Sequence, residues 1–215
     1  LFSKTSVVIF FTLLLGLIFI TFYRGAAETN NQNSQPYILV LPFGISSDEP
    51  KTGAPLFRGQ LPNVGADDVI VLWGGSLANW FDAMTPLKAV AKLKKKYPQV
   101  KLIFTGSKHP VWGKLPDSYQ KVVTFSQQKK MFDKNVFIFS DWVPYEERHR
   151  YLTESDAGIS TFHDHIENHF SFRIRLLDYL WGNLPILSNP GNTQSELIES
   201  EQLGHIVPFA DEHAL

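Results

Sequence analysis

Short apolar runs alternate with longer amphipathic segments from Val69 to the end of the chain. Runs such as VIVLW (69–73) contain no alternating polar residues, which is typical of strands buried on both faces of a parallel sheet. Repeated strand and helix units of this length predict an α/β fold with a doubly wound parallel sheet. The predicted strands are 69–73, 100–106, 136–139, 157–162, 185–188 and 205–209, and the predicted helices are 86–97, 119–132, 145–155, 172–181 and 193–200.

Ligands in sheets of this kind bind beyond the carboxyl ends of the strands. The loops that follow Trp73, Phe104, Phe139 and Phe162 are therefore expected to carry the chemistry.

The composition limits the classes of partner. The formal net charge is −1 and the chain has no cysteine. A near-neutral chain gives no reason to expect nucleic acid, which binds basic faces, and the lack of cysteine excludes disulfides and thiolate metal sites. Lys92 and the run 94–96 are interpreted as the solvated side of a helix that Thr85 is predicted to cap, with a phosphate-binding patch as the alternative.

The first 26 residues are a hydrophobic, transmembrane-like segment. Residues 6–23 are apolar apart from scattered serine and threonine and approach the ~20 residues that cross a bilayer as a helix. A membrane-spanning helix is therefore predicted, with a cleaved signal peptide as the alternative. Residues 27–35 are expected to be a polar tether, 36–68 a linker strand (37–43) and loop, and 69–215 the sheet domain.

The segment HDHIENHFSFRIRLLDYLW joins a predicted strand to a predicted helix. Ser171 is placed to cap this helix, and the amides and dipole of a first turn form an anion site. Arg173 opposes the dipole in that turn, and a bound phosphate would remove the conflict. The alternative is that Arg173 points to water or pairs with Glu167.

Two interpretations of Asp178 remain open on local pattern. An ion pair with Arg175, three residues earlier, is the simpler one. The other is that the Asp178 carboxylate accepts hydrogen bonds from the vicinal hydroxyls of a ribose.

Four segments together carry a family resemblance. In chain order they are VLWGGSLANWFDAMTPLKAVAKL, KLIFTGSKHP, DWVPYEERHRYLTESDAGIS and ENHFSFRIRLLDYLWGNLPI. They resemble the C-terminal, donor-binding half of a glycosyltransferase family 4 enzyme of the GT-B superfamily, in a bacterial branch. The resemblance covers residues 36–215 and does not extend to residues 1–35.

The resemblance implies a GT-B architecture, in which two Rossmann-like domains face each other across a cleft. This half would bind a nucleotide-diphosphate sugar, and the sugar would pass with retention to a glycan or lipid-linked acceptor without a metal or other cofactor. It also implies an acceptor domain before Tyr37, which the given sequence lacks, and a sheet domain truncated at its C-terminus.

Site residues follow from matching the family motifs. Glu167 matches an acid near the donor sugar and Asp178 an acid that contacts the ribose. Arg173 and the amides around Ser171 and Phe172 would face the diphosphate, so that Glu167 and Arg173 are the predicted catalytic residues.

Glycines complete the predicted donor site. Gly74, Gly75 and Gly106 would let the donor approach the backbone closely where the first two strands end. The motifs depart from those of the family at four points. Ten residues separate Glu167 from Asp178 where seven are common, and the second acid is aspartate where the family has glutamate. Ile174 stands between the two arginines, and Asn79, Trp80 and Asp82 occupy a region where many relatives carry arginine and lysine.

Three alternatives compete with this hypothesis. The histidines of HDHIENH (163–169) could hold a metal, although zinc sites need convergent ligands. A dinucleotide-dependent dehydrogenase would favour G-x-G-x-x-G after the first strand, and GGSLAN lacks that spacing. A catalytically inert, membrane-tethered module that binds a nucleotide sugar or a protein is the non-enzymatic alternative. The favoured expectation is a glycosyltransferase fragment for cell-surface glycan synthesis, associated with the cytoplasmic face of a membrane through residues 6–23.

Overall fold

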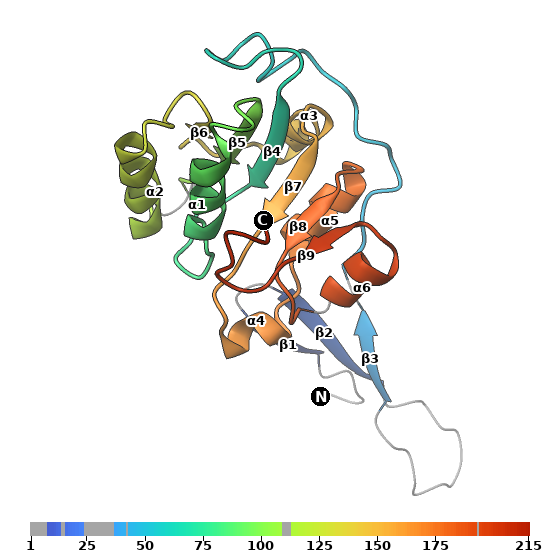
Figure 1. The fold of residues 1–215 in the computed structure, drawn as a ribbon. Helices are drawn as coiled ribbons and strands as arrows, with labels where there is room; N and C mark the ends of the chain where they lie inside the picture. The colour runs from blue at the N-terminus through green and yellow to red at the C-terminus, as the bar shows by residue number, and fades with distance from the viewer. Residues whose placement is uncertain (1–7, 14–15, 24–36, 42, 109–112, 193) are drawn as a thin grey trace, which may run out of the picture.

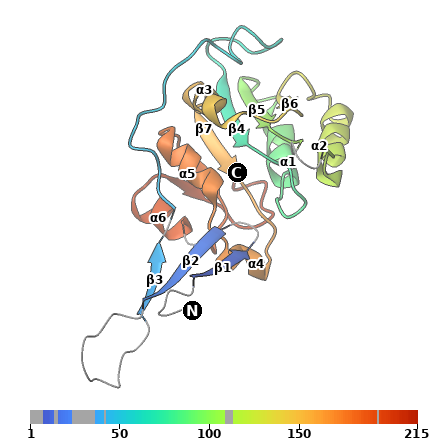
Figure 2. The ribbon, with the colours of Figure 1, turned by 180° about the vertical axis from the view of Figure 1, so that it is seen from behind.

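The computed structural model describes residues 8–13, 16–23, 37–41, 43–108, 113–192 and 194–215. A six-stranded parallel sheet forms its centre and helices cover both faces (Figures 1 and 2). The strands of this sheet are β4 (Val69–Gly74), β5 (Val100–Thr105), β6 (Val136–Ile138), β7 (Ala157–Ser160), β8 (Ile186–Ser188) and β9 (Gly204–Ile206). The helices are α1 (Met84–Leu93), α2 (Asp117–Gln128), the 3₁₀ turn η1 (Tyr145–Glu147), α3 (Arg148–Thr153), α4 (Ile166–Phe170), α5 (Ile174–Trp181) and α6 (Ser195–Ser200).

The order of the strands gives the sheet a Rossmann-like topology. Across the sheet the order is β6-β5-β4-β7-β8-β9, and every neighbouring pair is parallel. The chain starts in the middle at β4, builds outward to β6, and then crosses back to β7 on the other side of β4. This is the doubly wound order whose ligands bind where the direction reverses. The α/β fold class predicted from the alternation is confirmed.

Two apolar cores, one on each face, hold the sheet between its helices. Successive residues of a strand point to opposite faces. Trp73 accordingly packs with the residues of α1 and α2, whereas Ile70 and Leu72 pack with those of α3, α5 and α6. This burial on both faces explains why the strands are apolar without alternation.

Helix α1 begins two residues earlier than predicted, at Met84 rather than Pro86, and Asp82 provides its cap. The Asp82 carboxylate accepts hydrogen bonds from the amides of Met84 and Thr85, both at 3.1 Å, and from the Thr85 hydroxyl at 2.5 Å. The prediction of Thr85 as the N-cap is therefore wrong. A carboxylate two to three residues before the free amides can satisfy two of them at once.

The N-terminal segment differs from its prediction. Val8–Leu13 (β1) and Gly16–Tyr23 (β2) are strands and not parts of a helix, and they pair antiparallel with each other, while β2 pairs with β3 (Tyr37–Leu41). The β-branched and aromatic residues that dominate both segments favour extended backbone. Among the helices of the described residues, none has the length and apolarity to span a bilayer. Residues 1–7, 14–15 and 24–36 lie outside the description, so the predicted tether at 27–35 is not covered.

Candidate functional site

The carboxyl ends of the central strands carry two glycines in left-handed backbone. Gly75 follows β4 with φ 104° and Gly106 follows β5 with φ 68°. The two turns touch, because a β-carbon at Gly106 would lie 3.4 Å from the Gly75 α-carbon. Residues other than glycine rarely adopt this backbone conformation, so neither turn carries a side chain at these positions. The structure thus brings the predicted donor-binding glycines together, and their contact with a donor remains a prediction.

Tyr179 fixes helix α5 against the point where the sheet reverses direction. Its hydroxyl accepts a hydrogen bond from the Gly74 amide at 2.9 Å and lies 3.0 Å and 2.9 Å from the carbonyl oxygens of Leu72 and Ile159. Burial raises the pKa of Tyr179 to about 12, so the hydroxyl keeps its proton. The position of Gly74 is therefore tied to α5.

Arg175 lies in the first turn of α5, and its side chain extends to the loop at Gly75 and Ser76 that follows β4. Its guanidinium donates to the Ser76 carbonyl at 2.8 Å, and a β-carbon at Gly75 would lie 3.5 Å from its Nη2. The cation packs 4.2 Å from the Phe81 ring centre. Burial lowers the pKa of Arg175. The local sequence pattern indicates Arg175 only as an ion-pair partner, and its placement beside the glycines was not predicted.

Arg173 is a buried cation whose donors are only partly satisfied. Its side chain is 3% exposed, it donates from Nη2 to Asn168 Oδ1, and it lies 4.0 Å from the Phe162 ring centre. Its Nε and Nη1 are buried and have no hydrogen-bond partner among the described residues. Burial, followed by the charge of Arg175, lowers the pKa of Arg173 to about 10, against an opposing effect of Glu167.

The backbone of Arg173 is held firmly while those two side-chain donors stay free. The backbone amide of Arg173 donates to Gln194 Oε1 at 2.9 Å, and the side-chain Nε2 of Gln194 donates to the Arg173 carbonyl at 2.9 Å. Buried charged donors without partners are costly. An anion delivered by a ligand would satisfy them.

A short helix replaces the loop that was expected after β7. Helix α4 begins after His165, whose Nδ1 accepts from the Glu167 amide at 3.3 Å. The Ser171 hydroxyl donates to the Glu167 carbonyl at 2.5 Å, so that Ser171 ends α4. Helix α5 begins only at Ile174, and the prediction of Ser171 as its N-cap is wrong. The reason is that a serine side chain can bond backward to a helix carbonyl as readily as forward to an amide.

Glu167 and Phe172 have contacts other than Arg173. The Glu167 side chain is 73% exposed and lies 3.9 Å from His165 Nδ1. The ion pair with Arg173 that was weighed as an alternative is not among the ion pairs of the described residues; Arg173 bonds Asn168 instead. Phe172 places its ring 5.6 Å from that of Phe43.

Asp178 is paired with a residue from another helix. The Arg148 Nε donates to Asp178 Oδ1 at 3.2 Å, and the Arg148 guanidinium lies between the rings of Tyr145, at 3.6 Å, and Trp181, at 4.3 Å. The Asp178 side chain keeps 38% of its surface exposed. Burial raises the pKa of Asp178, and the hydrogen bond and charge of Arg148 oppose that rise. The local pair with Arg175, one of the two interpretations left open, is not among the ion pairs of the described residues, where Asp178 pairs with Arg148.

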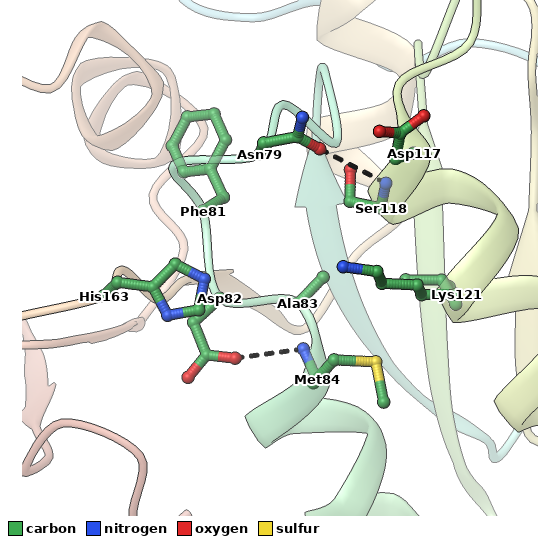
Figure 3. A pocket seen from close by; sticks show the side chains of 10 residues that line it. Asn79, Phe81, Asp82, Ala83, Met84, Asp117, Ser118, Lys121 and His163 are labelled. Carbon is green, nitrogen blue, oxygen red and sulfur yellow. Dashed lines mark hydrogen bonds between the residues drawn. The ribbon is translucent and has the colours of Figure 1, made fainter.

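A hollow of about 320 Å³ opens beside the start of α1 and α2 (Figure 3). Lys121 from α2 and His163 from the segment after β7 point toward it from opposite sides (Figure 3). Asn79 and Asp82 also line it, and both are engaged with helix starts: Asn79 accepts from the Ser118 amide at 3.3 Å. The structure therefore gives these two residues, whose role the sequence left open, a capping role.

The histidines after β7 engage neighbouring acids. His165 lies near Glu167, and His169 Nε2 lies 3.6 Å from Asp164. The described part of the chain contains no group of three or more histidine, aspartate or glutamate side chains placed to hold a metal ion.

Solved structures of glycosyltransferases share this fold. The C-terminal domain of a group 1 family glycosyl transferase (LpcC) from Francisella tularensis superimposes with a TM-score of 0.55 at 16% identity, over 72% of both chains. Anabaena HepE in complex with UDP and glucose gives 0.56 at 14% identity, over 69% of this chain and 37% of its own. WaaG, a glycosyltransferase involved in lipopolysaccharide biosynthesis, gives 0.56 at 17% identity, over 79% of this chain and 42% of its own.

These similarities establish the fold. This chain spans less than half the length of HepE and of WaaG. No model of a protein family matches the sequence, and no curated protein sequence matches it.

Proposed function

We propose that this chain is the donor-binding part of a glycosyltransferase and that it binds a nucleotide-diphosphate sugar at the carboxyl ends of β4 and β7. The observation that carries the proposal is Arg173, a buried cation at the start of α5 with two donor nitrogens that have no partner among the described residues. A diphosphate supplies charged acceptor oxygens for such donors. The Rossmann-like topology and its neighbours, one of them bound to UDP and glucose, support this class of ligand.

The proposed donor lies between two parts of the site. Its diphosphate faces Arg173 and the amides around Ser171 and Phe172, close to the bare turns at Gly75 and Gly106. Its ribose hydroxyls bond the Asp178 carboxylate, which is partly exposed and already receives one bond from Arg148. A carboxylate has acceptor sites for both the arginine and the hydroxyls.

The chemical step would use charge stabilisation at the leaving diphosphate. A preorganised cation in a dry site stabilises developing negative charge without reorganisation. Arg173 is assigned this role, and Glu167 is assigned to the donor sugar. Transfer with retention, without a metal or other cofactor, and membership of glycosyltransferase family 4 in a bacterial branch are the finer parts of the proposal, and they rest on the motif resemblance.

The setting of the reaction is proposed on the same basis. The acceptor is a glycan or a lipid-linked saccharide bound with the help of an acceptor domain, and the product belongs to a cell-surface glycan. The apolar residues 6–23 associate the chain with the cytoplasmic face of a membrane.

Titration calorimetry with UDP-, GDP- and ADP-glucose tests the proposal. Saturable binding of one donor, competed by the matching nucleoside diphosphate, is expected. Two other outcomes contradict the proposal in different ways. A chain that binds none of the donors loses the proposed function outright, whereas a chain that binds one but transfers no sugar with its acceptor domain present is a binding module.

Arg148→Met is expected to shift the pH dependence of donor binding. The ionised form of Asp178 is the one that accepts from ribose hydroxyls, so affinity falls as pH drops through the pKa of Asp178. Burial raises this pKa and Arg148 holds it down, so loss of Arg148 raises the pKa further. The midpoint of a plot of affinity against pH should therefore move to higher pH.

Arg150→Met provides the matched control for that titration. Arg150 lies two residues away on α3 and pairs with Glu147 at 2.7 Å, not with Asp178. Its loss should leave the midpoint unchanged. Equal midpoints in the wild type and in the Arg148 variant would remove Asp178 from the donor site.

A further inference from the structure

The lysines of this chain are concentrated in one segment. Twelve of the fourteen lie between Lys88 and Lys134, together with no arginine and only two carboxylates, Asp117 and Asp133. The segment carries a formal charge of +10, and the rest of the chain carries −11, which sum to the overall −1. The near-neutral total therefore conceals a strongly basic region.

The fold gathers the lysines of α1 and α2 on one side of the sheet. Helices α1 and α2 lie side by side on the same side of the sheet (Figures 1 and 2), and the Lys94 ammonium group donates to the Lys129 carbonyl between their C-terminal ends. The inward side of α1 is apolar or small, including Leu87 and Val90. Seven lysines are exposed on α1, on α2 or within three residues of their C-terminal ends, and we call these seven the lysine face: Lys88, Lys92, Lys95, Lys96, Lys121, Lys129 and Lys130.

Most of the lysine face forms no ion pair with an acid of the described residues. Among the ion pairs of the described residues, only Lys92, with Glu212 at 3.2 Å, and the buried Lys101, with Asp68 at 3.6 Å, involve lysines of this segment. Exposed like charges held this close repel one another and attract counter-charge. Solvation alone accounts for a few lysines on a helix, but not for the exclusion of arginine and of nearly every acid from the segment.

The composition of the face favours a lipid surface over nucleic acid. Lysine and arginine both contact nucleic-acid phosphates, but the planar fork of arginine is the commoner donor for bidentate contacts to bases, and this segment has no arginine. Lysine is a hydrated point charge on a flexible stem, which suits attraction to a field of mobile anionic headgroups. Tyr97, 38% exposed with the Lys96 ammonium group 4.9 Å from its ring centre, is an amphipathic side chain of the kind found at membrane interfaces.

We propose that the lysine face binds the anionic surface of a lipid bilayer. The contact is electrostatic and independent of the apolar residues 6–23. Asp178 lies on α5, which packs with the core on the opposite face of the sheet, so a membrane on α1 and α2 leaves the proposed donor site open. The chain thereby gains a preference for anionic lipid that an apolar segment alone does not supply.

Sedimentation with vesicles of two compositions tests the proposal on the full chain. Vesicles of phosphatidylcholine alone report any attachment through residues 6–23, and vesicles that also contain phosphatidylglycerol add the anionic surface. We expect tighter binding to the anionic vesicles and a loss of that preference as salt is raised. Each lysine near such a surface strengthens binding about fivefold. Lys95→Gln should weaken binding to anionic vesicles by that factor, and the pair Lys88→Gln and Lys95→Gln about 25-fold.

Lys51→Gln is the matched control, because Lys51 is exposed but lies outside the lysine face. It should bind both vesicle types as the wild type does, and all variants should bind the donor nucleotide equally. The proposal is overturned if the double variant keeps its preference for anionic vesicles or if Lys51→Gln loses as much as Lys95→Gln. Tighter binding to a DNA duplex than to anionic vesicles would assign the face to nucleic acid and overturn the proposal as well.

Discussion

Replacement of Arg173 by methionine is expected to weaken the binding of a nucleotide-diphosphate sugar about tenfold to a hundredfold while making the free protein more stable. The lost affinity corresponds to a charged hydrogen bond, about 1.5–3 kcal/mol. Stability should rise by about 1 kcal/mol, because methionine occupies the buried site without leaving charged donors unpaired. Few structural substitutions move these two quantities in opposite directions, so the combination identifies a residue kept for a ligand.

Arg58→Met is the matched control for this prediction. The Arg58 guanidinium donates to the Asp68 carbonyl at 3.0 Å and to Asp156 Oδ2 at 2.6 Å, so its donors have partners within the protein. Its loss should lower the free energy of unfolding by about 1 kcal/mol and leave donor affinity unchanged. Denaturant unfolding and calorimetry on both variants make the comparison. The role of Arg173 is excluded if its variant is destabilised as the Arg58 variant is and binds the donor normally.

The architecture of the sheet domain was accessible from the sequence because its signals are local. Continuous apolar runs mark strands buried on both sides, and β4 and β5 were placed to within one residue. The N-terminal segment was harder. An unbroken apolar run such as that around Phe10 is compatible with a helix or with paired strands, and the choice depends on whether another strand, here β3, lies beside it.

The candidate site was less predictable because it depends on contacts between distant segments. The pattern correctly placed Gly75 and Gly106 at strand ends, where backbone geometry alone requires glycine. The partner of Asp178 could not be found in this way. Its pair with Arg148 spans thirty residues and exists only because α3 and α5 pack on the same face of the sheet, whereas the local spacing rule pointed to Arg175.

Substitution of Gly158 by alanine is expected to lower the free energy of unfolding by about 3 kcal/mol, the upper end of the usual cost of overpacking. Gly158 lies in β7 directly beneath the Tyr179 ring, and a β-carbon there would lie 2.3 Å from Tyr179 Cγ. The ring cannot swing aside, because it is fully buried and its hydroxyl is bonded to Gly74 and lies beside the carbonyl oxygens of Leu72 and Ile159. Denaturant unfolding monitored by circular dichroism measures the loss.

Two further variants identify the origin of that loss. Gly65→Ala is the control for the change of residue type, because a β-carbon at Gly65 meets only the Asp68 carboxylate at 3.9 Å, and its effect should stay within about 0.5 kcal/mol. Tyr179→Leu removes the ring and its bonds. If the clash with the ring causes the loss, alanine at Gly158 should cost about 1–3 kcal/mol less in the Tyr179→Leu background. If the losses caused by Gly158→Ala and Tyr179→Leu simply add, the loss at Gly158 arises in the backbone of β7. The clash with the Tyr179 ring would then not be the reason for glycine at this position.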